Sequence, residues 1–339
     1  MPSVCIFSFN CYIHQKIFLL YKCIKILSRL GIKIYCRKII INKPDLLKIK
    51  GPVLLACNHP NSFLDSVLLD TLFSEPVWSL ARGDAFKKPF YVKLLTALKI
   101  LPVYRTSEGT ENLGENYKTF DACIDIFKKN GIVTIFSEGR CINEWHLRPL
   151  KKGTARLAFK AWEENIPLKI LPVGINYNSF RSFGKNIFLN FGEFIMKDDF
   201  NFVNADGLRH QSFNVKLQEQ LEQLVFEIPQ DDKERKKNLL KINIGIFTKI
   251  LLFIPALLGF ITHAPLYIPA KFFTVNKTKS TDHHDSVILS ILLFSYIFYL
   301  LIITFVLWMI TGSWWIFLLL IAMPFTAWSY VQLKSQFDK

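Results

Sequence analysis

Apolar residues recur along this chain with two different periods. Within 12–34 they return every three, four or seven residues, while Lys22, Lys25, Arg29 and Lys33 lie on another face, which predicts an amphipathic helix. From 35 to 230, short apolar runs alternate with amphipathic stretches, which predicts an α/β domain. The predicted strands are 34–41, 53–57, 77–81, 101–104, 132–136, 170–175 and 187–191, and the predicted helices are 62–73, 87–98, 115–129 and 153–164.

The last third of the chain has a third pattern. A highly charged stretch over 230–241 indicates a domain boundary, and 286–333 contains no charged residue at all. That length accommodates two membrane spans of roughly 20 residues each. The Thr311-Gly312-Ser313 segment between them predicts the turn of a C-terminal transmembrane helical hairpin.

The apolar run over 244–270 is less regular. It contains Lys249, His263 and three prolines, a composition that favours a re-entrant or interfacial segment over a plain span. If only the hairpin crosses, the basic residues that flank these segments all lie on the same side as the N-terminal domain, as basic cytoplasmic segments do.

Composition and charge also indicate a membrane. Hydrophobic residues make up 51% of the chain and charged residues only 20%, and the net charge is +15. The first 50 residues hold ten Lys or Arg and one acid, Asp45. We therefore expect 1–34 to be a membrane-associated helix. No basic–aromatic pattern of a nucleic-acid-binding module is present, so we expect no nucleic-acid partner. The seven cysteines form no Cys-x-x-Cys pair, and we expect no metal site.

The first candidate for chemistry is the segment Asn58-His59-Pro60-Asn61-Ser62-Phe63-Leu64-Asp65, directly after a predicted strand. If a helix begins near Ser62, then Asp65 lies in its first turn, where the helix dipole favours the ionised carboxylate. A carboxylate beside His59 would fix the tautomer of the ring and make it a better general base. The alternative is that Ser62-x-x-Asp65 is a variant of a capping box and His59 an ordinary loop residue.

Three more segments follow strands or lie on them, and each is weak alone. Ser137-Glu138-Gly139-Arg140 combines a glycine turn with an arginine, which suits an anion site. Arg105 comes just after another strand. Pro172 interrupts an apolar strand, for which the alternative is a strand at the sheet edge.

Taken together and in this order, these segments resemble the glycerolipid acyltransferase family over about residues 35–200. The resemblance implies a mixed, largely parallel sheet flanked by helices. It also implies transfer of an acyl group from acyl-CoA or acyl carrier protein to a hydroxyl of a glycerol phosphate, without a cofactor. In that family His59 would deprotonate the hydroxyl, and Asp65 would orient His59.

The resemblance also assigns the substrate contacts. Arg105, Glu138 and Gly139 would help to hold the acceptor phosphate, with Arg140 a further candidate, and Pro172 would lie near the acyl donor. The chain departs from the usual pattern in having five residues rather than four between His59 and Asp65. It also has Ser137 where the family usually has proline and Cys141 where it usually has arginine.

We therefore expect an integral membrane enzyme whose acceptor is lysophosphatidic acid or glycerol-3-phosphate. Its site would face the cytoplasm, at a bacterial inner membrane or the endoplasmic reticulum. The alternatives are another lysolipid acceptor, such as a lyso-aminolipid, or a non-catalytic membrane protein with a basic cytoplasmic domain. His283 and His284, between Asp282 and Asp285, are expected to form a solvated loop rather than a metal site.

Overall fold

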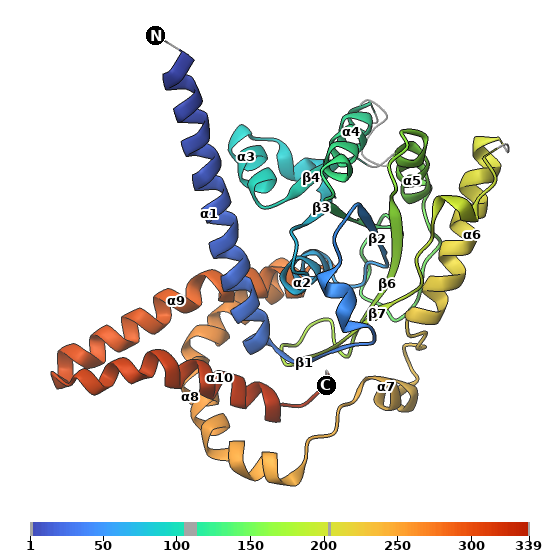
Figure 1. The fold of residues 1–339 in the computed structure, drawn as a ribbon. Coiled ribbons are helices and arrows are strands. Elements are labelled where there is room, and N and C mark those ends of the chain that lie inside the picture. The colour runs from blue at the N-terminus through green and yellow to red at the C-terminus, as the bar shows by residue number, and fades with distance from the viewer. Residues whose placement is uncertain (1–2, 105–113, 203–204, 338–339) are drawn as a thin grey trace.

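The computed structural model describes residues 3–104, 114–202 and 205–337. Within this part of the chain, seven strands form one sheet in the order β1-β7-β6-β2-β5-β3-β4 (Figure 1). The strands are β1 (Cys36–Ile41), β2 (Val53–Cys57), β3 (Val77–Arg82), β4 (Ile100–Val103), β5 (Ile132–Phe136), β6 (Lys169–Tyr177) and β7 (Lys185–Phe191). Only the β6–β7 pair is antiparallel among these described pairs. The prediction of a mixed, largely parallel sheet flanked by helices is confirmed.

Ten α-helices accompany the sheet in the described residues. They are α1 (Ser3–Tyr35), α2 (Phe63–Leu72), α3 (Pro89–Ala97), α4 (Glu115–Lys128), α5 (Gly153–Glu163), α6 (Asp206–Leu224), α7 (Lys233–Leu240), α8 (Ile246–Lys277), α9 (His284–Thr311) and α10 (Leu319–Leu333). The helices predicted between strands are α2 to α5. The charged stretch predicted as a boundary contains the short helix α7.

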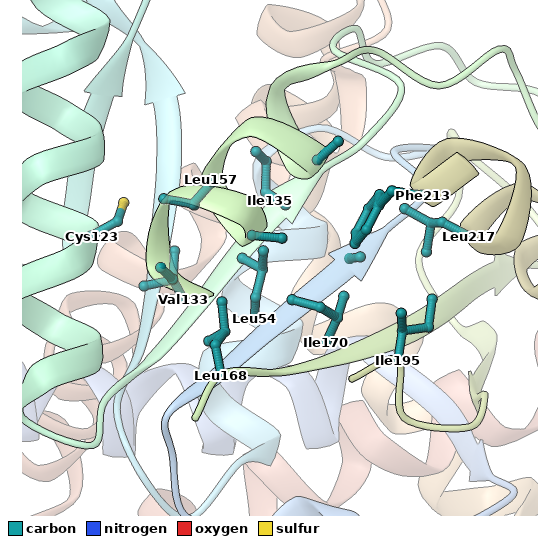
Figure 2. Packing of buried hydrophobic residues seen from close by; sticks show 14 of the residues in the cluster. Leu54, Cys123, Val133, Ile135, Leu157, Leu168, Ile170, Ile195, Phe213 and Leu217 are labelled. Atoms are coloured by element: carbon teal, nitrogen blue, oxygen red, sulfur yellow. The ribbon is translucent and has the colours of Figure 1, made fainter. Parts of the chain in front are cut away.

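The two faces of the sheet are covered by different helices. Along β2, Leu54 and Ala56 pack with α4, α5 and α6, while Val53, Leu55 and Cys57 pack on the opposite face with α2 and α9. This follows from the two-residue period of a strand. Both faces are buried, which is why these strands are continuous apolar runs. Figure 2 shows part of the first face, where Leu54, Val133, Ile135 and Ile170 of the sheet lie beside Leu157, Phe213 and Leu217 of the helices.

The C-terminal hairpin has the predicted turn. α9 ends at Gly312, whose φ of 63° is the left-handed conformation common after a helix C-terminus. The chain then returns through a short 3-10 helix (Trp314–Leu318) and α10, and the hairpin projects away from the sheet (Figure 1). Large apolar side chains near its tip are exposed, for example Ile310 at 74% and Trp315 at 79%. Such an apolar surface suits lipid rather than water.

The segment predicted as re-entrant or interfacial forms one continuous helix. α8 passes through Pro255, Pro265 and Pro269, and by length and composition 246–277, 284–311 and 314–333 could each cross a membrane. α8 packs closely on α10, since a Cβ at Gly259 would lie 2.1 Å from the carbonyl oxygen of Thr326. In Figure 1 α8 is bent. Its placement at the membrane surface stays a prediction.

The hairpin is anchored in the α/β domain. Ile288 and Leu289, near the start of α9, are 2% and 5% exposed and belong to the same hydrophobic cluster as Leu64 and Leu68 of α2. The two helices of the hairpin are therefore not an appendage, because the first of them completes the core on one face of the sheet.

Two basic residues of α1 that were predicted to lie toward a membrane instead contact the α/β domain. The Lys25 ammonium is buried 3.3 Å from Asp70, and Arg29 donates two hydrogen bonds to carbonyl groups at the C-terminal end of α2. Cations are favoured there by the unpaired carbonyls and the helix dipole. The face of α1 that is left exposed includes Phe18, Leu19, Leu20, Ile26 and Leu30. Contact with a membrane through α1 would therefore be mainly apolar.

Candidate active site

The loops after β2 and β5 meet at one edge of the sheet. These strands are parallel neighbours, with Cys57 opposite Phe136, so both chains leave the sheet in the same direction. The backbone N–H of His59 donates to Oε2 of Glu138 at 2.7 Å. The two segments that the sequence singled out, 79 residues apart, are thus joined directly.

His59 has one ring nitrogen engaged and one available. Its Nδ1 lies 2.9 Å from Oδ2 of Asp65, and its ring stacks on Phe136 at 3.9 Å between centroids. The side chain is 15% exposed. When Nδ1–H donates to the carboxylate, Nε2 carries the lone pair, so Nε2 is the atom that can accept a proton.

Asp65 is fully buried and accepts three hydrogen bonds. Oδ2 accepts hydrogen bonds from Nδ1 of His59 and from the backbone N–H of Asn61, both at 2.9 Å. Oδ1 accepts a hydrogen bond from the hydroxyl of Tyr177 at 2.7 Å. Burial, together with the neighbouring Asp65 charge, raises the pKa of Tyr177 well above its usual value, so this hydroxyl remains a donor. Three donors hold the carboxylate in one orientation against the ring. Tyr177, which sequence reasoning missed, lies at the end of β6 on the same sheet edge.

Ser62 does not cap α2 in the way that the alternative reading of this segment required. It occupies the N-cap position with φ 53°, and its side chain makes no capping bond. Its N–H donates to Sγ of Cys141 at 3.0 Å, and its hydroxyl lies 2.7 Å from Nδ1 of His283. The capping-box alternative is therefore wrong. The positive φ turns the chain before α2, so that Asp65 reaches His59 across five intervening residues.

Glu138 lies beside His59 but does not face outward. It is 5% exposed, and its two oxygens accept the backbone N–H groups of His59 and Arg148 at 2.7 and 3.0 Å. Burial raises its pKa, and the two N–H donors oppose that rise. Gly139 follows with φ 68° and donates its N–H to the carbonyl of Phe136. In this geometry Glu138 positions two loops, and a role for it in phosphate binding stays a prediction.

Asp285, at the start of α9, also supports the site. Its Oδ2 lies 2.5 Å from Nζ of Lys185 and accepts from the Asn61 side chain at 2.8 Å, while its Oδ1 accepts from Tyr35 at 3.0 Å. Asp285 and Lys185 are both fully buried. The expectation of a solvated loop was wrong for His284 and Asp285, which are buried, whereas His283 is exposed.

Arg140, Arg105 and Pro172 are the remaining predicted site residues. Arg140 is exposed on the turn, and Arg105 lies outside the described residues, two positions after the end of β4. Pro172 is buried in β6, which lies between β7 and β2, so the sheet-edge alternative was wrong. Its carbonyl accepts from Gly192, just beyond the end of β7, where the missing proline N–H interrupts no regular ladder. Its predicted link to the acyl donor stays a prediction.

The thiols near the site are unsuited to nucleophilic catalysis. Burial raises the pKa of Cys57 to about 12, and it also raises the pKa of Cys141. Within residues 3–104, 114–202 and 205–337, no three His, Cys, Asp or Glu side chains are grouped so that they could hold a metal ion. The reactive group that the described residues offer is the His59 imidazole, oriented by the buried carboxylate of Asp65.

Comparisons with known proteins address the same segment. Residues 38–176 match the model of the family described as Acyltransferase. A solved structure, the 1-acyl-sn-glycerophosphate (LPA) acyltransferase PlsC from Thermotoga maritima, is similar with 14% identity and a TM-score of 0.40, covering 64% of this chain and 89% of its own. A superposition at this level is too distant to assign a substrate. A sequence comparison with curated proteins gave no significant match.

Proposed function

Because residues 38–176 match the model of the acyltransferase family, we propose that this protein is a membrane-bound acyltransferase of phospholipid biosynthesis. Its donor is acyl-CoA or acyl carrier protein, and its acceptor is lysophosphatidic acid or glycerol-3-phosphate. The observation that carries the proposal is the 2.9 Å contact between the partly exposed ring of His59 and the buried carboxylate of Asp65.

In the proposed reaction His59 is the general base. Its Nε2 takes the proton of the acceptor hydroxyl while the hydroxyl oxygen attacks the thioester carbonyl. Asp65 stabilises the imidazolium that forms. When the tetrahedral intermediate collapses, the C–S bond breaks and the thiolate takes the proton from Nε2, which restores the neutral ring. Backbone N–H groups at the N-terminus of α2 would stabilise the developing oxyanion by donating hydrogen bonds to it.

The arrangement of the membrane helices supports a site at the lipid surface. Lys271 of α8 and Lys334, just after α10, line one cavity together with Arg181 of the α/β domain. Arg37 of β1 also donates to carbonyl groups of Gln332 and Lys334. These basic helix ends therefore lie on the side of the basic domain, which favours a cytoplasmic orientation, at a bacterial inner membrane or the endoplasmic reticulum.

The test is an assay of the full chain in detergent. Acyl-CoA or acyl carrier protein is offered with glycerol-3-phosphate, lysophosphatidic acid or a lyso-aminolipid. We expect turnover with a phosphorylated glycerol acceptor, and a loss of about 10²- to 10⁴-fold in His59→Ala, the usual contribution of a general base. His146→Ala is the matched control, because His146 is exposed and its ring pairs with Glu227 rather than with Asp65.

Three outcomes would overturn the proposal in whole or in part. Retained turnover in His59→Ala would remove the general-base assignment. Turnover with the lyso-aminolipid alone would show that the acceptor is not a glycerol phosphate. No turnover with any combination of donor and acceptor would favour a non-catalytic role. Membrane insertion of His59→Ala, measured by fractionation, should equal that of the wild type.

A further inference from the structure

A large cavity lies between the membrane helices and the α/β domain. Its volume is about 1320 Å³, and its walls come from α1, α8, α9, α10 and the loop that joins β6 to β7. Small-molecule pockets usually measure about 300–1,000 Å³, so this space is larger than a headgroup alone requires. None of His59, Asp65 and Glu138 is among its lining residues. The cavity is therefore separate from the catalytic pair.

The inside of the cavity is mainly apolar. Its lining includes Leu27 and Leu30 of α1, Leu293 and Leu300 of α9, and further apolar residues of α8 and α10. These side chains would contact hydrocarbon chains, because α9 is long and apolar enough to cross a membrane and α1 exposes apolar side chains such as Ile26 and Leu30.

The charged residues that line the cavity all have the same sign. They are Lys33, Arg181, Lys271 and Lys334, and no Asp or Glu is among the lining residues. They come from four separate segments of the chain, and the first three are exposed. Four positive charges around one apolar space, without an acid among them, are complementary to a single anionic group attached to hydrocarbon.

We propose that this cavity binds one anionic glycerophospholipid. The phosphate lies at the mouth among Lys33, Arg181 and Lys271, and the acyl chains extend between α1, α9 and α10. The lipid is a resident ligand rather than a reacting substrate, and the inference does not depend on the proposed acyl transfer.

Native mass spectrometry of the full chain tests this binding without an acyl donor. The protein is delipidated in detergent and titrated with dioleoyl phosphatidic acid or dioleoyl phosphatidylcholine. We expect one phosphatidic acid per chain to be retained in clear preference to phosphatidylcholine. The triple variant Lys33→Gln, Arg181→Gln and Lys271→Gln should weaken phosphatidic acid binding by roughly 100-fold, because each basic residue near an anionic lipid contributes about fivefold.

A matched variant controls for total charge. This triple variant removes three positive charges from α1 and α8 by Lys22→Gln, Lys249→Gln and Lys277→Gln. None of the three positions lines the cavity, so its lipid binding should equal that of the wild type. A second test is Ala264→Trp, which fills part of the cavity and should exclude lipid whatever its headgroup.

Equal loss in the two triple variants would overturn the proposal, because the effect would then be one of net charge. Equal retention of both lipids by the wild type would overturn it as well. Because lipid retention and acyl transfer are measured separately, failure of this proposal is distinguishable from failure of the proposed function.

Discussion

Replacing Asp65 by asparagine removes one charge from the site while keeping its shape. The carbonyl oxygen of the new side chain can still accept from His59 and from the N–H of Asn61, as Oδ2 does now. Its amide group then faces Tyr177, whose hydroxyl can accept a hydrogen bond instead of donating one. Every partner keeps a hydrogen bond, so we expect Asp65→Asn to fold.

The expected loss of rate follows from the imidazolium that forms during the reaction. Opposite unit charges about 4 Å apart interact by about 4 kcal/mol at an effective dielectric constant of 20, which corresponds to roughly 10³-fold in rate. The His59 side chain is 15% exposed, so solvent screens part of this attraction. We therefore expect kcat to fall by about 100- to 1,000-fold. KM should change little, because Asp65 is buried behind the ring.

The assay follows thiol release from acyl-CoA with a chromogenic reagent, for the wild type and for Asp65→Asn. Asp70→Asn is the matched control, since it makes the same chemical change further along α2, where Asp70 contacts Tyr21 and Lys25 instead of the site. We expect Asp70→Asn to change thermal stability but not kcat. A kcat for Asp65→Asn within about threefold of the wild-type value would refute the reasoning. Loss of the attraction between the Asp65 carboxylate and the imidazolium should lower kcat far more than that.

Two further substitutions test the groups that hold the site together. Asp285→Ala leaves the Lys185 ammonium charged and fully buried, and we expect a loss of about 3–5 kcal/mol in the free energy of unfolding, much of it recovered when Lys185→Met is added. Thermal unfolding in detergent measures this, and an unchanged melting temperature for Asp285→Ala would argue against the buried pair. Glu138→Gln deprives one backbone N–H of its acceptor, so we expect the unfolding free energy to fall by about 1–3 kcal/mol, and kcat to fall by about 10- to 100-fold through displacement of His59. Glu164→Gln, which alters a surface pair, is the control, and equal kcat values in the two variants would contradict a positioning role for Glu138.

Local patterns were enough to predict the strands. Val53–Cys57 and Ile132–Phe136 are buried on both faces, so each is an uninterrupted apolar run that ends where polar residues begin. The ends of such runs also indicated His59 and Glu138, because the carboxyl ends of parallel neighbours meet at one edge. By contrast, α6 was not predicted, although its four buried residues recur every three or four positions, as expected of a surface helix.

The support of the site could not be read from the sequence. Asn61 and Asp285 are 224 residues apart and meet only because α9 packs its first turns on α2. Nothing in the chain near Asp285 distinguishes a buried carboxylate from a solvated one. The cavity is likewise formed by helices from both ends of the chain. Short-range periodicity therefore determined the strands and indicated the candidate catalytic segments at their ends, while burial between distant helices decided which charges are paired and where an apolar space remains.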